Sequence, residues 1–173
     1  MTQPDNTVAL PWAAAFDALL DALLAACREH YRRRLVSLVV FGSVGRRTMR
    51  PDSDIDLLVV ADPLPDGRMR RMEDFAPIER IMDPVLMEKQ TVGVTTRLSP
   101  VFKTPAEIVA GSPLLLDMTQ DSRALFDADD FFGLQMRDLD ARLKRLGARR
   151  VFKGDAWWWD LKPDFKPGDV VTL

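Results

Sequence analysis

Apolar residues switch between helical and strand-like spacing along the chain, and this alternation predicts a fold that mixes helices with strands. Over about residues 11–31 they recur every three or four positions, which predicts a helix with one core-facing side. Two short, almost wholly apolar runs follow, at residues 35–41 and 54–61. Runs of this kind are typical of strands covered on both faces, so we expect two neighbouring buried strands.

The middle of the chain is helical in pattern over residues 67–90, but Pro77 and Pro84 interrupt it. Since proline removes a helical hydrogen bond, we expect either one kinked helix or two short ones. A third strand is predicted over residues 92–102. The elements expected after it are a short helix at 105–110 with a capping box from Thr104 and Glu107, a second short helix from Ser112, a strand including 124–126 and a helix over 129–146 ended by Gly147.

The last 26 residues have a different character, with recurrent proline and glycine and no long periodicity. Trp157, Trp158 and Trp159 stand in a row there. Aromatic clusters usually cover the edge of a core, and recognition of a partner is the alternative. We therefore expect one domain over residues 1–147 and a C-terminal tail, residues 148–173, that packs on it.

Length, charge and cysteine content narrow the class of protein. A chain of 173 residues with a net charge of −2 fits one compact domain and argues against bulk electrostatic binding of nucleic acid. Cys27 is the single cysteine, so an internal disulfide is excluded. No membrane-spanning or leader-like segment is evident, and we expect a cytoplasmic protein.

The charge pattern reverses abruptly around Pro51. Residues 28–50 hold seven arginines and one acid, whereas residues 51–66 hold five aspartates and no base. Arginines can bind phosphate oxygens, and aspartates can hold the divalent cation that accompanies a phosphate. This order of charges indicates a site for phosphate groups together with their divalent cation; solvated loop charge between two core strands is the alternative.

The strongest candidates for metal ligands are Asp54 and Asp56. Two residues apart in a strand, they point to the same face, while Ile55 and Leu57 face the other way. Magnesium needs few protein carboxylates and completes its shell with water and phosphate, so the pair suits Mg²⁺. A zinc set is not indicated, because His30 is the only histidine.

Before these aspartates, Gly42 and Ser43 end the first apolar strand. Glycine lets the backbone turn closely around a phosphate, and the serine adds a hydroxyl. The whole stretch, VVFGSVGRRTMRPDSDIDLLVV, closely resembles the signature of minimal nucleotidyltransferases of the DNA polymerase β-like superfamily. That family has a small mixed β-sheet with helices packed on it, so the resemblance implies an α/β (α+β) fold of this type.

The resemblance also implies roles for individual residues. Gly42 and Ser43 fall on triphosphate-binding positions, Arg46 on the basic position that follows them, and Asp54 and Asp56 on the metal-binding positions; Ser53 completes the Ser-Asp-Ile-Asp form common in the family. The implied cofactor is Mg²⁺ and the implied substrate is a nucleoside triphosphate.

Two departures from the family pattern bear on catalysis. Arg47 stands where the family usually has glycine, and the predicted strand after the long helix, TVGVTTRLSPVF, has none of the acids that active members place there. Glu79, Asp83 or Glu88 could replace that third carboxylate if the helix brings one of them inward.

The sequence and the resemblance are compatible with four functions. The first is Mg²⁺-dependent transfer of a nucleoside monophosphate to a hydroxyl of a partner protein, because minimal members of the family often act as antitoxins that modify a toxin. The second is a catalytically weak nucleotide-binding module that acts through a partner. A small-molecule acceptor and nucleic-acid polymerisation rank below these, since the chain has little room for an acceptor-binding or template-binding domain.

Overall fold

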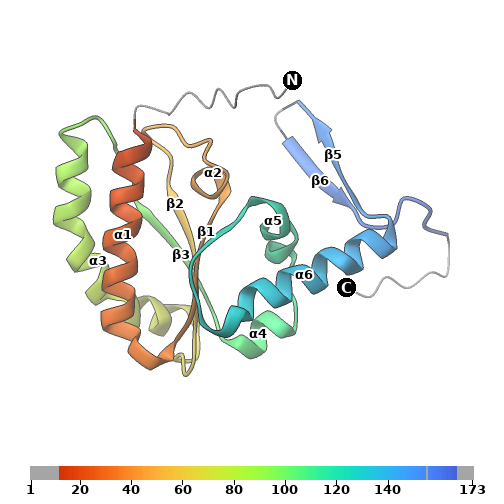
Figure 1. Ribbon diagram of the computed structural model, residues 1–173, viewed down its shortest axis with the longest axis horizontal. Helices are drawn as coiled ribbons and strands as arrows, with labels where there is room; N and C mark the ends of the chain where they lie inside the picture. Colours follow the sequence, from red (N-terminus) through yellow and green to blue (C-terminus); the bar gives the residue numbers. More distant parts are fainter. Residues whose placement is uncertain (1–11, 155, 167–173) are drawn as a thin grey trace, which may run out of the picture.

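A four-stranded sheet with strand order β3-β2-β1-β4 forms the centre of the molecule (Figure 1). The computed structural model describes residues 12–154 and 156–166. The helices are α1 (Ala13–Tyr31), α2 (Gly42–Gly45), α3 (Arg68–Gln90), α4 (Pro105–Val109), α5 (Pro113–Asp121) and α6 (Phe131–Leu146). The strands are β1 (Leu35–Phe41), β2 (Ile55–Ala61), β3 (Leu98–Lys103), β4 (Arg123–Asp127), β5 (Arg149–Lys153) and β6 (Ala156–Asp160).

The register of the sheet places the ends of β1 and β2 side by side. β1 runs antiparallel to β2, with Phe41 opposite Asp56, and antiparallel to β4. β2 runs parallel to β3, with Asp56 opposite Ser99. The sheet is therefore mixed, and the predicted α/β (α+β) class with helices packed on a small mixed sheet is confirmed.

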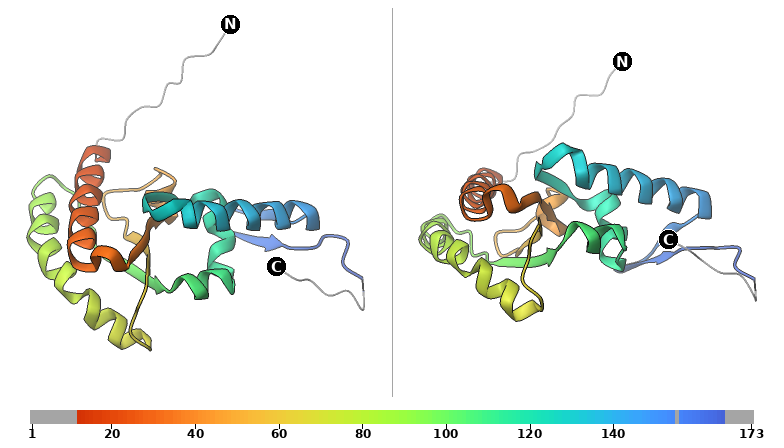
Figure 2. Two further views of the ribbon diagram at one scale, coloured as in Figure 1. Left: turned by 60° about the horizontal axis from the view of Figure 1, so that its bottom comes forward. Right: turned by 90° about the horizontal axis from the view of Figure 1, so that it is seen from below.

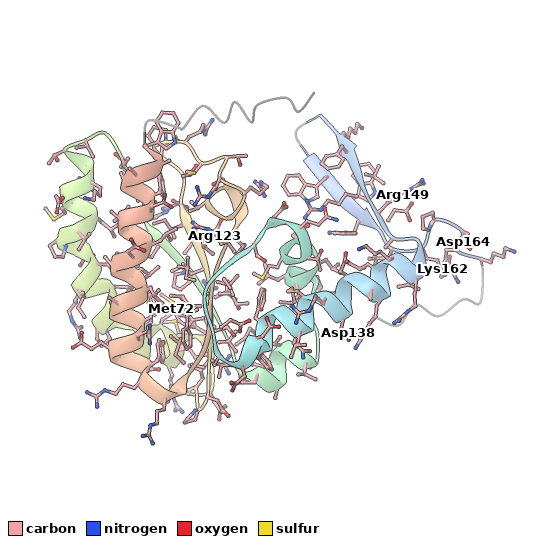
Figure 3. The ribbon with its side chains drawn as sticks, viewed as in Figure 1. Met72, Arg123, Asp138, Arg149, Lys162 and Asp164 are labelled. Carbon is pink, nitrogen blue, oxygen red and sulfur yellow. The ribbon has the colours of Figure 1, made fainter. Side chains whose placement is uncertain are left out.

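Helices cover both faces of this sheet, α1 and α3 on one side and α4, α5 and α6 on the other (Figure 2). Neighbouring residues of β2 enter the two cores alternately: Leu57 packs with α1 and α3, and Leu58 packs with α5 and α6. Met72, labelled in Figure 3, is one of the partly buried side chains at the first core. Burial of each large apolar side chain contributes about 1.5–3 kcal/mol, so both layers hold the sheet in place.

The two predicted buried strands and the helices at both ends of the domain are confirmed. α1 begins at Ala13; Pro11 lies outside the described residues. The capping box of α4 is present, with the Glu107 N–H donating to the Thr104 hydroxyl and the Glu107 carboxylate accepting from the Thr104 N–H. Gly147 ends α6 with a φ of 70°.

Two predictions needed refinement. The segment 68–90 is one helix that contains both prolines, and Figure 2 shows that its axis changes direction along its length. The third strand begins at Leu98 rather than at residue 92, because Thr95 and Thr96 bond across to another segment instead. The Thr95 N–H donates to the Pro51 carbonyl, and the Thr96 hydroxyl donates to the Ser53 carbonyl.

The C-terminal segment contains a two-stranded antiparallel hairpin, β5 and β6, which the sequence pattern did not predict. Trp157 and Trp159 are half-buried and point their indole N–H groups at Asp117 of α5, whereas Trp158 is 51% exposed. These contacts support a tail packed on the domain. The boundary between residues 147 and 148 stays a prediction.

Among residues 12–154 and 156–166, every helix is too short or too polar to cross a membrane. Cys27 is fully buried in the first core, and burial raises the pKa of its thiol to about 12. Cys27 therefore packs as an apolar side chain of this core. A cytoplasmic location stays a prediction.

Candidate nucleotide and metal site

The residues singled out in the sequence gather at one end of the sheet because β1 and β2 are antiparallel neighbours. Gly42 follows the last residue of β1, Asp54 directly precedes β2, and Asp56 is the second residue of β2. The pairing of Phe41 with Asp56 brings these two chain segments together. A ten-residue loop between them does not separate them in space.

The Gly-Ser turn forms a single helical turn, α2, that approaches Asp56 very closely. Gly42 has a φ of 64°, and a Cβ placed on it would lie 2.5 Å from the Asp56 Oδ2 atom. A Cβ on Gly45 would lie 2.6 Å from the Asp121 carbonyl oxygen. Both positions therefore require glycine. Ser43 lies between them in the chain and lines the same cavity as Asp56.

Arg46 directs its side chain away from α2 toward α5 and the hairpin. Its Nη1 atom lies 3.3 Å from Asp121 Oδ2, and its guanidinium lies 5.5 Å from the centre of the Trp157 ring. Asp121 is buried, so this contact fixes the arginine beside the turn. Arg46 therefore lies beside the turn, and its role toward a triphosphate stays a prediction.

Arg47 has a φ of 59°, a left-handed conformation that glycine adopts readily. This geometry explains why glycine is usual here in the family.

We expect Arg47→Gly to raise the free energy of unfolding by up to ~1 kcal/mol by relieving the strain of the left-handed backbone at this position. Urea denaturation would measure it. Arg47→Ala is the matched control, because it removes the side chain but keeps the Cβ. Equal stability of the two variants would contradict the strain.

Asp54 and Ser53 are both engaged by neighbouring segments. The Arg97 Nε atom lies 3.0 and 3.1 Å from the two carboxylate oxygens of Asp54. The Ser53 hydroxyl accepts from the Arg50 N–H at 2.9 Å and so closes the turn before β2. In this structure Ser53 shapes the loop that presents Asp54, and its role toward a nucleotide stays a prediction.

Asp56 is the most perturbed carboxylate of the site. Burial raises its pKa, and the charge of Asp54 raises it further, while a hydrogen bond from Ser99 and the charge of Arg46 act in the opposite direction. Ser99 was missed in the sequence because nothing in its segment marks it. Only the parallel register, which sets Ser99 opposite Asp56, reveals it.

The position of a third acid is occupied by other groups. β3 presents Ser99 to Asp56. Arg97, the residue directly before β3, pairs with Asp54. Glu79 and Asp83 line a separate cavity of about 330 Å³ with Arg97, and Glu88 pairs with Lys89. Within the part of the chain that the structure describes, no three His, Cys, Asp or Glu side chains form a metal-binding group.

A cavity of about 280 Å³ joins four of the predicted residues to the C-terminal half of the chain. Gly42, Ser43, Arg46 and Asp56 line one part of it. The rest is lined by Phe41 and by residues of α5 and β6: Leu114, Asp117, Met118, Asp121 and Trp157. Four of the predicted residues therefore open onto one shared space, whereas Ser53 and Asp54 are not among the residues that line it.

The donor set at the aspartates fits a magnesium ion. Two carboxylates on the same face of a strand supply hard oxygen ligands, and Mg²⁺ takes its remaining ligands from water and phosphate. The close approach of Gly42 keeps the Asp56 oxygen open to the turn, since any Cβ there would fill the space. Burial raises the pKa of Asp56 most, and the charge of Asp54 adds to this; a divalent cation would relieve the repulsion between the two carboxylates.

Asp56→Asn should stabilise the protein while it impairs the site. Folding raises the pKa of Asp56. The ionised carboxylate therefore lowers the free energy of unfolding at pH values above this raised pKa, and it has no effect at pH values below the pKa of the unfolded chain. We expect a gain on the order of 1 kcal/mol at neutral pH, which disappears as the solution is acidified through the raised pKa. Thermal unfolding across pH would measure it; a gain that persists in acid would contradict this cause.

Comparison with known proteins agrees with the geometry. Residues 20–103 match the model of the nucleotidyltransferase domain family. The chain is 28% identical over 130 residues to the "Putative protein adenylyltransferase MJ1305" of Methanocaldococcus jannaschii, a match that spans 74% of this chain and 83% of that protein.

Solved structures share the fold at low identity. The spectinomycin adenyltransferase of Enterococcus faecialis, solved with ATP and spectinomycin, gives a TM-score of 0.52 at 15% identity over 76% of this chain and 67% of the other. A toxin–antitoxin structure with AMP-PNP gives a TM-score of 0.48 at 17% identity over 73% and 88% of the two chains. The match to the spectinomycin adenyltransferase shows that the chain has a nucleotidyltransferase fold.

Fold and site together define a nucleotidyltransferase domain. The resemblance seen in the Gly-Ser and Asp-Ile-Asp motifs is confirmed: residues 20–103 form a nucleotidyltransferase domain of the polymerase β-like type, and the chain is similar to the Methanocaldococcus jannaschii relative. The class of reaction is therefore the transfer of a nucleotidyl group.

Proposed function

We propose that this protein transfers AMP from ATP to a hydroxyl group on a partner protein, with Mg²⁺ held by Asp54 and Asp56. The observation that carries the proposal is the single cavity lined by Gly42, Ser43, Arg46 and Asp56. AMP as the transferred group and a protein as its acceptor are supported by the name of the Methanocaldococcus jannaschii relative.

The reaction forms a bond between the acceptor oxygen and the α-phosphorus of ATP. The bond from that phosphorus to the oxygen bridging to the β-phosphate breaks, and pyrophosphate leaves. The hydroxyl proton passes to solvent, because β3 presents Ser99 rather than an acid to Asp56. A divalent cation, when bound, supplies neutralisation of phosphate charge and lowers the pKa of the attacking hydroxyl.

The chain's own residues bind and orient the triphosphate. The turn from Gly42 to Gly45 offers backbone N–H groups close to the aspartates, and Ser43 adds its hydroxyl. Arg46 provides positive charge at the other side of the turn, where pyrophosphate develops as the leaving group. Ser99 holds the Asp56 carboxylate in position by its hydrogen bond.

Radioactive transfer would test the proposal directly. The protein is incubated with Mg²⁺ and a lysate of its native host, with ATP labelled either at the α- or at the γ-phosphate. We expect label on protein from α-labelled ATP only, with release of pyrophosphate. Label from γ-labelled ATP would indicate phosphoryl transfer and would contradict the proposal.

A second function, a nucleotide-binding module with weak catalysis, is favoured by one observation. Ser99 and Arg97 occupy the places next to Asp56 and Asp54 where active relatives have an acid. Tight binding of ATP with Mg²⁺ but no release of pyrophosphate in the presence of the host lysate would favour this function over AMP transfer.

A further inference from the structure

The cavity at the Gly-Ser turn has a second half that the family motif does not account for. Leu114 and Met118 of α5 and the indole of Trp157 give it an apolar and aromatic lining. The carboxylates of Asp117 and Asp121 stand at the same end. A triphosphate has no use for apolar walls, and carboxylates repel it, so this half suits a different part of the ligand.

The hairpin forms a fixed wall of this half because Asp117 ties it to α5. The Asp117 Oδ1 atom accepts from the Trp157 indole at 3.2 Å, from the Trp159 indole at 2.9 Å and from Arg150 at 3.2 Å. Arg150 also pairs with Asp121 at 2.7 Å, and its side chain is 9% exposed. All three donors bond to the Oδ1 atom of Asp117. The other carboxylate oxygen of Asp117, Oδ2, is a further acceptor.

Figures 1 and 3 show the same arrangement at the level of the fold. β6 lies beside α5, and hairpin side chains occupy the space between them; Arg149, labelled in Figure 3, marks the start of β5. The neighbouring residue Trp158 is exposed and belongs to the other side of the hairpin, since successive strand residues face opposite ways. One indole therefore lines the cavity while its neighbour does not.

We propose that this half of the cavity is the nucleobase subsite, in which adenine packs against Trp157 and donates its exocyclic amino group to Asp117. The inference rests on the proposed function, which supplies ATP as the substrate. A planar aromatic base matches an indole and two aliphatic side chains, and a carboxylate oxygen accepts from an amino group. The triphosphate then lies toward Gly42 and Ser43, away from the two carboxylates.

The subsite makes the choice of base a matter of one hydrogen bond. Adenine presents an amino group where hypoxanthine, the base of ITP, presents a carbonyl oxygen. A carboxylate facing that oxygen would be left without a donor, which costs about tenfold or more in affinity. ATP should therefore bind at least tenfold more tightly than ITP.

Trp157→Ala tests the stacking contact, with Trp158→Ala as the matched control from the same strand. Affinities for ATP and for inorganic tripolyphosphate are measured by calorimetry in Mg²⁺. We expect Trp157→Ala to weaken ATP binding about tenfold and to leave tripolyphosphate unchanged, because only the base is lost. We expect Trp158→Ala to change neither. Equal weakening of both ligands would mean that Trp157 acts only through Arg46, and would overturn the subsite.

Asp117→Asn tests the amino-group contact without removing the anchor of the hairpin. Asparagine keeps an oxygen that accepts from the indoles and turns the other position into an N–H donor. The preference should reverse, with ITP gaining and ATP losing about tenfold each. Unfolding temperature, followed in parallel, reports whether the hairpin stays in place.

The outcomes separate this inference from the proposed function. Wild-type protein that binds no ATP in Mg²⁺ would overturn both. Wild-type protein that binds ATP, with Trp157→Ala and Asp117→Asn unchanged in affinity for ATP and ITP, would overturn the subsite alone and leave this half of the cavity to the acceptor side chain.

Discussion

A variant carrying both Asp54→Ala and Asp56→Ala is expected to lose Mg²⁺-dependent binding of ATP and about 10³-fold or more of its transfer rate. These carboxylates are the only predicted metal ligands, and they share one face at the start of β2. Removing charge stabilisation from the reacting centre commonly costs this much. Calorimetry with ATP in Mg²⁺ and in excess chelator measures the binding, and α-labelled ATP measures the rate.

Asp52→Ala is the control for this double variant. Asp52 lies in the same loop but is exposed and pairs only with Arg50, at 3.4 Å, among the contacts described. Its loss should leave ATP binding within a factor of two, as expected for a screened surface pair. ATP affinity that is the same in the double variant as in wild type, or the same with and without chelator, would sink the assignment of the metal site.

Ser99→Asp is expected to raise the transfer rate by about 10²–10⁴. Ser99 lies opposite Asp56 in the parallel register, so an acid there would stand beside this predicted metal ligand. It could then accept the proton of the attacking hydroxyl, and general-base assistance is typically worth this factor. Arg97→Ala, added in the same chain, frees Asp54 from its ion pair and should increase the gain.

Thr95→Asp provides the comparison for this gain. It adds the same charge in the loop between α3 and β3. Thr95 is exposed, however, and its backbone N–H donates to the Pro51 carbonyl rather than to β2. We expect no increase in its rate. If Ser99→Asp and Thr95→Asp behave alike in a pyrophosphate-release assay, the position opposite Asp56 has no special role in catalysis.

The sequence predicted the parts of the site that are local in the chain. Two consecutive strands, β1 and β2, carry these residues at adjoining ends: Gly42 and Ser43 directly after β1, and Asp54 and Asp56 around the start of β2. A short connection favours antiparallel pairing of two such strands, as observed. The apolar runs of β1 and β2 were recognisable because both faces of the sheet are covered. The first residue of helix α4, Pro105, was predicted correctly because the capping box that begins the helix is formed by residues close together in the sequence.

What the sequence could not predict depends on contacts between distant segments. The role of Ser99 follows from a parallel register set 43 positions away from Asp56 along the chain, and serine carries no pattern of its own. The hairpin was missed because a pair of five-residue strands gives almost no periodicity. Its position follows from Asp117 and Arg150, whose pairing only the packed structure reveals.

Pro100, in the middle of β3, determines how another chain can meet this sheet. The Ile55 N–H donates to the Arg97 carbonyl, so by alternation Leu98, Pro100 and Phe102 turn their nitrogens to the outer edge. Proline has no N–H to offer there, and the outer row of donors is broken at its centre. A second polypeptide cannot extend the sheet continuously on this side. The acceptor protein proposed above would therefore be recognised through side chains and surface shape rather than by strand addition at β3.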